Sequence, residues 1–140
     1  MYKITIFSVG KTKESWLLEA ISEYEKRLKS VIELQWVFVK KSEQLVPLLE
    51  QTPFIALTPE AKQYSSEEFS IQMHHFLEKL GSRLAFLIGG AEGIAPELLS
   101  KAFATISFSK MTFTHQMVRL LLIEQIYRAT EIEKGSGYHK

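Results

Sequence analysis

The residues Leu84–Gly93, with the sequence LAFLIGGAEG, decide the fold of this 140-residue chain. Leu84–Ile88 is an uninterrupted apolar run, which is typical of a strand in a parallel sheet that is covered on both faces. Two glycines follow this run, and Pro96 lies where a helix would begin. The segment therefore predicts a buried parallel strand whose carboxyl end opens into a glycine-rich turn.

Strand and helix patterns alternate on both sides of this segment. The other predicted strands are Lys3–Val9, Ile32–Val39, Phe54–Leu57 and Thr105–Phe108, and the predicted helices are Lys13–Lys29, Ser42–Glu50, Ser65–Leu80 and His115–Glu133. Such alternation is typical of α/β proteins. We expect one domain over residues 1–140, with a mostly parallel sheet flanked by helices, because no repeat or linker interrupts the pattern.

The composition excludes several kinds of site. The chain has no cysteine, which excludes disulfides and thiolate zinc sites. It carries 17 basic and 16 acidic residues, so its net charge is +1. A protein of this charge can bind nucleic acid only through a local patch. Candidate lysines for such a patch are Lys11, Lys13, Lys40, Lys41 and Lys110.

Neither a membrane span nor a signal peptide is predicted. No apolar run approaches the ~20 residues that cross a bilayer. Lys11 and Lys13 follow the apolar start of the chain too closely for a secretory signal. We expect a cytoplasmic protein.

The final predicted helix is apolar around more of its circumference than a one-sided helix needs. Its apolar residues are Met117, Val118, Leu120, Leu121, Leu122, Ile123, Ile126, Tyr127, Ala129 and Ile132. Such a helix is either central in the domain or docked on a second subunit. We expect a homodimer in which Leu120 or Ile123 faces the partner.

Three segments carry chemistry-bearing residues. The turn Gly89–Gly93 follows a strand end, where open α/β sheets bind ligands, although an ordinary turn would also use glycine. Its spacing is neither the G-x-G-x-x-G of dinucleotide folds nor that of a phosphate loop. The loop before the last helix leads to His115 and Arg119, which share one helical face and suit either an anion or solvent. The tail ends in Tyr138, His139 and Lys140, and the alternative there is an ordinary frayed terminus.

These segments, taken in order, resemble the RlmH group of SPOUT-class methyltransferases over essentially the whole chain. The resemblance is carried by Leu87–Gly93 (LIGGAEG), Ser109–Arg119 (SKMTFTHQMVR), Leu122–Ala129 (LIEQIYRA) and the terminal Tyr138–Lys140 (YHK). It implies an α/β domain with a C-terminal trefoil knot, a homodimer, and S-adenosylmethionine as methyl donor. It also implies methylation at N3 of a pseudouridine in large-subunit ribosomal RNA.

The resemblance also assigns residues to this site. The cofactor would be held by Leu57, Gly89, Gly90, Phe108, Ser109, Lys110, Met111, Thr112 and Phe113. Tyr138, His139 and Lys140 would form a catalytic tail that completes the partner's site, and no metal would be required. The chain departs from the usual pattern at Thr58, Ala61, Ala91, Thr114 and Lys140.

The chemistry of N3 methylation leaves two roles open. A neutral imide nitrogen is a poor nucleophile, so either its proton is removed or the developing anion is stabilised. His139 suits the first role, and the cations Lys140 and Arg119 suit the second. The alternative functions are a non-catalytic nucleotide- or RNA-binding module that uses the same glycine-rich edge, and an assembly protein that uses only the apolar helix.

Overall fold

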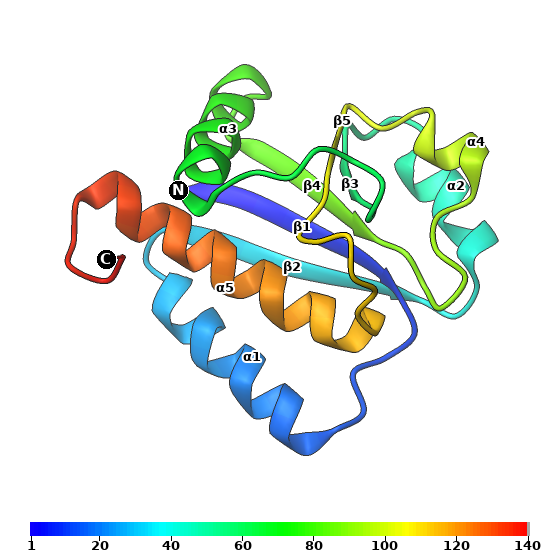
Figure 1. Ribbon diagram of the computed structural model, residues 1–140, viewed down its shortest axis with the longest axis horizontal. Helices are drawn as coiled ribbons and strands as arrows, with labels where there is room; N and C mark the ends of the chain where they lie inside the picture. The colour runs from blue at the N-terminus through cyan, green and yellow to red at the C-terminus, as the bar shows by residue number, and fades with distance from the viewer. Residues whose placement is uncertain (140) are drawn as a thin grey trace.

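The computed structural model describes residues 1–139 as a parallel sheet with helices on both faces (Figure 1). The strands are β1 (Tyr2–Val9), β2 (Ile32–Val39), β3 (Ile55–Leu57), β4 (Arg83–Ile88) and β5 (Ala104–Ile106). The helices are α1 (Ser15–Leu28), the 3-10 turn η1 (Ser42–Gln44), α2 (Leu45–Leu49), α3 (Ser66–Lys79), α4 (Pro96–Leu99) and α5 (His115–Lys134). The expected α/β class with a parallel sheet is confirmed.

The five strands are arranged in the order β2-β1-β4-β3-β5, and every neighbouring pair is parallel. All strands therefore end at one edge of the sheet, which we call the carboxyl edge. β4 lies at the centre and is the predicted LAFLI strand, buried from Leu84 to Ile88. Its continuous apolar sequence follows from this position, because both of its faces are covered.

Two apolar clusters lie on opposite faces of the sheet. One is formed with α1, α3 and α5 and contains Ile4, Ile6 and Phe86 from the strands. The other is formed with the short α2 and α4 and contains Phe7 and Leu87. Alternate residues of β1 and β4 thus point to different layers, as a strand requires.

Most predicted elements lie where expected, and the differences are local. β2 matches its predicted range, while β5 is shorter than Thr105–Phe108 because the chain leaves the sheet after Ile106. The predicted helix around Pro47 is split into η1 and the one-turn α2. Pro47 lies in the first turn of α2, where its missing N–H removes no helical hydrogen bond.

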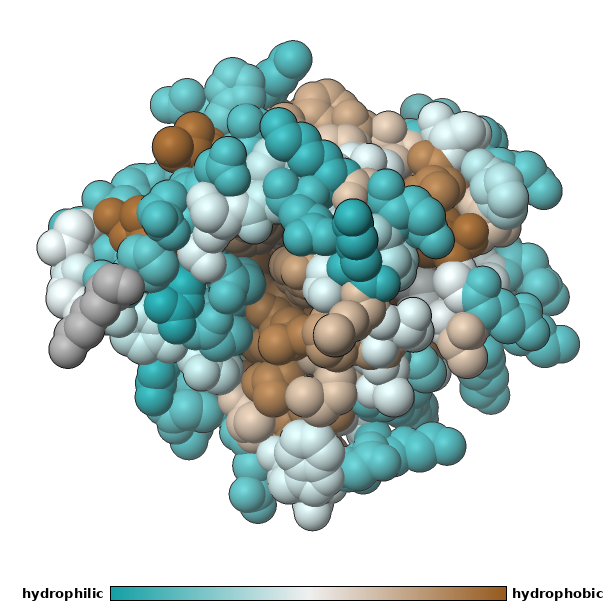
Figure 2. Space-filling view, viewed as in Figure 1, coloured by the Kyte–Doolittle hydropathy of each residue, from teal (hydrophilic) through white to brown (hydrophobic). Residues whose placement is uncertain are grey.

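α5 is the central helix of its layer and packs against both α1 and α3. Ile123 is fully buried in the core of its own chain, so the expectation that it can face a partner is wrong. Leu120 and Leu121 are only half-buried. Figure 2 shows apolar surface on the face where Figure 1 draws α5 and α1. No helix within residues 1–139 has the length and apolarity needed to span a membrane.

Candidate active site

The carboxyl edge brings together the three segments to which the family resemblance assigns cofactor binding. Leu57 at the end of β3 pairs with Ile88 of β4 and with Ile106 of β5. Gly89 and Gly90 directly follow Ile88, and Phe108 begins the loop two residues after Ile106. Three adjacent strands therefore deliver Leu57, the glycine turn and the 108–113 loop to one place.

Hydrogen bonds join two of these loops. The amide of Thr58 donates to the carbonyl of Ile106 at 3.0 Å, and that of Ser107 donates to Lys62 at 3.0 Å. The buried Ser107 hydroxyl lies within hydrogen-bond distance of the carbonyls of Pro59 (3.2 Å) and Ser109 (3.0 Å). The loop after β3 is thereby fixed against the loop after β5.

The far end of the 108–113 loop is open to solvent. Phe108 and Ser109 are half-buried, whereas Lys110, Met111, Thr112 and Phe113 are exposed. Met111 is 74% exposed and Phe113 42%, which is unusual for side chains of this size. Exposed apolar side chains beside a strand edge are available to contact a ligand or another chain.

Gly89 is required by a close approach of the backbone. A Cβ atom at this position would lie 2.8 Å from the carbonyl carbon of Gly93 and 2.8 Å from Cγ1 of Ile94. Gly90 has less severe crowding, since its Cβ would lie 3.3 Å from Cβ of Val9. The turn is thus folded tightly on itself at the end of the central strand, with the side chains of Ile94 and Val9 packed against its two glycines.

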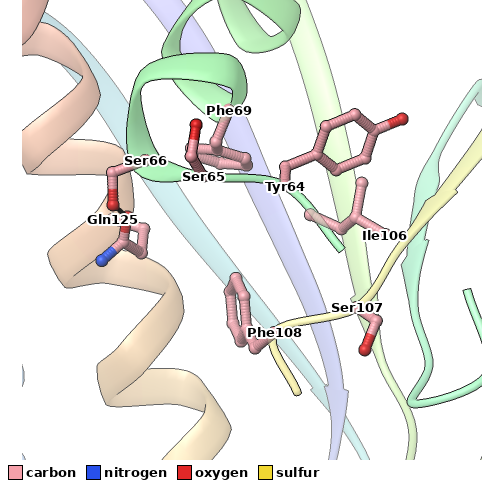
Figure 3. Close-up of a pocket in the computed structure, with 8 residues that line it drawn as sticks. All are labelled: Tyr64, Ser65, Ser66, Phe69, Ile106, Ser107, Phe108 and Gln125. Atoms are coloured by element: carbon pink, nitrogen blue, oxygen red, sulfur yellow. Dashed lines mark hydrogen bonds between the residues drawn. The ribbon is translucent and has the colours of Figure 1, made fainter. Parts of the chain in front are cut away.

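Two small pockets flank this edge. The first, of about 190 Å³, is lined by Tyr64, Ser65, Ser66, Phe69, Ile106, Ser107, Phe108 and Gln125. Figure 3 shows Phe108, Ile106 and Gln125 around this pocket, with Ser66 directed at Gln125, and the Ser66 hydroxyl lies 2.7 Å from Gln125 Oε1. The second pocket, also about 190 Å³, lies on the α2 and α4 side and includes Gly89 and Gly93.

Each pocket is smaller than the ~300–1,000 Å³ typical of a site that encloses a whole drug-sized ligand. Phe108 belongs to the first pocket and Gly89 to the second. A ligand held by both the glycine turn and the Phe108 loop would therefore place different parts in different pockets.

Arg119 is fully buried beneath the end of β1. Its Nε donates to the Ser8 hydroxyl at 3.0 Å, and its two terminal nitrogens donate to four further oxygens at 2.7–3.2 Å. These oxygens are the carbonyls of Val9 and Gly10, the hydroxyl of Thr12 and Oε1 of Gln116. All five N–H groups of the guanidinium are thus used within its own chain.

The environment of Arg119 contains no carboxylate partner among residues 1–139. Its guanidinium lies 4.8 Å from the centre of the Phe38 ring, and burial lowers its pKa to about 10. His115, one turn earlier, is half-buried beside Gly10, and burial together with the charge of Arg119 lowers its pKa. The expectation that Arg119 presents a cation to a ligand is not met, because none of its donors is free.

The described part of the tail, Tyr138 and His139, folds back on its own chain. The Tyr138 hydroxyl donates to Glu124 at 2.8 Å, and its ring packs edge-on against Tyr127 at 4.8 Å. Burial and the hydrogen bond to Glu124 raise the pKa of Tyr138. Lys140, the third predicted tail residue, lies outside the described residues.

His139 is held by two charged side chains. Arg128 Nη1 lies 3.0 Å from His139 Nδ1, and Glu67 Oε1 lies 3.0 Å from Nε2. Since arginine can only donate, Nδ1 must accept, and the ring hydrogen is assigned to Nε2 facing Glu67. In this arrangement neither ring nitrogen is free to accept a proton.

The tail and the carboxyl edge do not meet within one chain as far as residues 1–139 show. The tail contacts Glu67 on α3 and the middle of α5, whereas Leu57 and Gly89–Gly90 lie at the strand ends. The tail comes closest to the first pocket at two places along the chain. Its partners Glu67 and Glu124 directly adjoin Ser66 and Gln125, which line that pocket.

Sequence reasoning missed the partners of these residues. Ser8, Thr12 and Gln116 come from distant positions and have no motif that signals a shared arginine. Glu124 and Arg128 could have been found, because they lie four apart on the last helix and form an ion pair at 3.0 Å.

Proteins with an open parallel α/β sheet bind their ligands beyond the carboxyl ends of the strands. This chain has such a sheet, and its glycine turn and the loops after β3 and β5 lie at that edge. Residues 2–139 match the family described as "Predicted SPOUT methyltransferase". The chain belongs to this family of methyltransferases, as its sequence resemblance implied.

Similar proteins agree with this assignment. The "Ribosomal RNA large subunit methyltransferase H" of Protochlamydia amoebophila is 48% identical over 141 residues, which cover the whole of both chains. The protein of the same name from Bacillus cereus is 41% identical and covers 98% of this chain and 99% of its own. The recognition of the RlmH group is thereby confirmed.

Solved structures agree at the level of the fold. A methylase family protein from Haemophilus influenzae Rd KW20 superimposes with a TM-score of 0.56 at 10% identity, over 94% of this chain and 66% of its own. A Bacillus anthracis protein, whose description names an RNA methyltransferase, gives a TM-score of 0.54 at 10% identity over all of both chains. The trefoil knot implied by the resemblance stays a prediction.

Proposed function

We propose that this protein transfers a methyl group from S-adenosylmethionine to N3 of a pseudouridine in large-subunit ribosomal RNA. The observation that carries the proposal is the meeting of Leu57, Gly89–Gly90 and the Phe108 loop at one sheet edge, in a chain that belongs to a methyltransferase family. The names of its relatives support ribosomal RNA as the substrate. A cytoplasmic location is consistent with that substrate.

The carboxyl edge suits the methyl donor in both shape and chemistry. Gly89 and Gly90 have no side chain of their own and are only half-buried, so their backbone groups are accessible to a ligand. The first pocket offers the apolar walls Phe108 and Ile106 to a flat base, with Ser66 and Gln125 as polar groups. The remaining loop residues Ser109–Phe113 would close over the donor. When bound, the donor supplies an electrophilic methyl group on a positively charged sulfur.

The protein then has to position the N3 nucleophile and to accept its proton. Holding two reactants in line supplies much of the acceleration of such a displacement. His139 would take the N3 proton, which requires that it leave Arg128 and Glu67, because both of its nitrogens are engaged there. Tyr138 and Lys140 would stack on or pair with the RNA.

Binding of the donor is tested by calorimetry on the Gly89→Ala variant. A Cβ atom 2.8 Å from backbone of the same turn forces the turn to shift. Overpacking of this kind costs about 1–3 kcal/mol, so we expect the affinity for S-adenosylmethionine to fall roughly 10- to 100-fold.

The matched control is Lys101→Ala, an exposed residue at the opposite edge of the sheet. It is expected to keep the affinity of the wild type. Failure of the wild-type protein to bind the donor, with or without ribosomes, would count against the proposed function. If the Gly89→Ala variant and the wild type bind S-adenosylmethionine with equal affinity, the glycine turn is not part of the donor site.

A homodimer would complete this site. Each tail lies away from its own carboxyl edge, which supports the idea that the edge receives the tail of a partner. α1 exposes Trp16 and Leu18, and α5 leaves Leu120 half-buried, so apolar area is available for a partner.

We expect Leu120→Glu to separate the subunits, because it puts a charge into the apolar contact. Sedimentation velocity at micromolar concentration measures the result. Ile71→Glu, at a 68% exposed apolar residue on α3, is the control and should leave the dimer intact. If Ile71→Glu separates the subunits and Leu120→Glu does not, the interface lies on α3. If the wild-type protein is a monomer at this concentration, the homodimer is excluded.

A further inference from the structure

Two lysine-bearing loops lie side by side at the carboxyl edge. Val9 and Val39 are paired at the ends of β1 and β2, and the amide of Gly10 donates to the carbonyl of Val39 at 2.7 Å. The lysines that follow these strands therefore share one rim. We define the basic rim as Lys11, Lys13, Lys40 and Lys41, all exposed and none ion-paired within residues 1–139.

The loop that carries Lys11 and Lys13 is held in place by α5. Arg119 donates to the carbonyls of Val9 and Gly10 and to the hydroxyl of Thr12. Gln116 adds a hydrogen bond at 2.8 Å to the carbonyl of Lys11 itself. Four consecutive loop residues thus have their position fixed from below, while the lysine side chains remain in solvent.

The charge beneath the rim adds to it. All hydrogen-bond partners of Arg119 are neutral, so no carboxylate cancels its charge. The carboxylates nearest in sequence are Glu14 and Glu43, both exposed. Glu92 of the glycine turn and Glu97, which lines a pocket with Glu43, are exposed at the same edge. Five positive groups therefore stand against four negative ones, and the lysines lie together on the two loops after β1 and β2.

We propose that the basic rim binds phosphate groups of the RNA backbone and holds the RNA against the loops at the same edge. This inference rests on the proposed function. A nearly neutral protein needs a concentrated patch to bind RNA, and the rim lies at the strand ends beside the glycine turn. Lysine is a point charge without base preference, so the rim positions the RNA and does not read its sequence.

The test measures how salt affects binding to purified large ribosomal subunits and to their protein-free RNA. The rim variant replaces Lys11, Lys13, Lys40 and Lys41 with glutamine. The control variant replaces Lys26, Lys29, Lys79 and Lys101 with glutamine, which removes the same charge from exposed positions at the opposite edge. Both variants are titrated by calorimetry with S-adenosylmethionine as well.

We expect the rim variant to lose roughly tenfold or more in affinity for both probes at about 0.1 M salt. The slope of log K against log salt should become shallower by about 0.7 for each phosphate that the substituted lysines no longer neutralise. The control variant should keep the wild-type slope, and both variants should keep the wild-type affinity for the donor.

Several results would overturn the inference. Equal slopes for the rim variant and the wild type would exclude phosphate binding by the rim. An equal loss of RNA affinity in the rim variant and the control variant would show that only the net charge of the protein matters. A reduction seen with ribosomal subunits but not with protein-free RNA would assign the rim to a ribosomal protein. The donor titration separates these results from failure of the proposed function, since that failure appears as a wild type that does not bind S-adenosylmethionine.

Discussion

Replacing Arg119 with methionine should lower the free energy of unfolding by about 3–5 kcal/mol, which is a large part of the stability of a small domain. Each hydrogen bond to a charged group contributes about 1.5–3 kcal/mol, and the cost of burying the guanidinium charge offsets part of their sum. The variant removes five hydrogen bonds at once. The Ser8 hydroxyl is fully buried and would lose its Arg119 partner, at a cost of about 1–3 kcal/mol for a group left unsatisfied. Equilibrium unfolding in urea at neutral pH measures the difference.

Arg83→Met is the matched control, since Arg83 is an exposed arginine at the start of β4. It should change the stability by no more than about 0.5 kcal/mol. Arg119→Lys should recover only part of the loss, because an ammonium group has three donors and cannot reproduce the planar fork. An Arg119→Met variant as stable as the control would show that the buried network contributes nothing to the fold.

The second large effect is expected at the tail. If His139 takes the proton from N3, His139→Ala should lower kcat by about 10²- to 10⁴-fold while the affinity for S-adenosylmethionine stays unchanged. Removal of residues 138–140 should lower turnover at least as much. The measurement is single-turnover transfer of a labelled methyl group to ribosomes, with donor affinity determined separately.

His75→Ala provides the control, because His75 is an exposed histidine on α3 without a place in the proposed site. It should keep full turnover. If His139→Ala were fully active while the tail deletion was inactive, the proton would have to be managed by Tyr138 or Lys140. Full activity of the tail deletion would exclude any catalytic role for the tail and would favour a site built from the loops alone.

Sequence periodicity predicts most of the sheet because buried strand positions are occupied by apolar residues. Leu84–Ile88 is apolar at every position because β4 is central, and β2 alternates because it lies at the edge. The end of β5 was predicted too late, since Phe108 is apolar for a reason other than strand pairing: it lines a pocket.

The role of Arg119 could not be predicted in the same way. Its spacing from His115 placed it correctly near the start of the last helix, but spacing along one helix does not reveal what lies above it. The partners Ser8 and Thr12 lie more than one hundred residues earlier and become neighbours only through the fold. A cation expected at the surface is therefore found in the core, where it organises a loop.

The glycine turn shows the opposite case. Its place after a strand end predicts a functional role for Gly89, and the structure gives an independent reason for a glycine there in the backbone of Gly93. The residue types of the tail predict a chemical role, whereas its contacts with Glu67, Glu124 and Arg128 depend on side chains that carry no motif of their own.

The central claim is that this protein adds one methyl group to large-subunit ribosomal RNA. Mass spectrometry of that RNA, from cells with and without the gene, tests the claim most directly. We predict that a single pseudouridine loses the mass of one methyl group when the gene is deleted and regains it when the wild-type gene is restored. Identical methylation of the RNA from both kinds of cells would contradict the account.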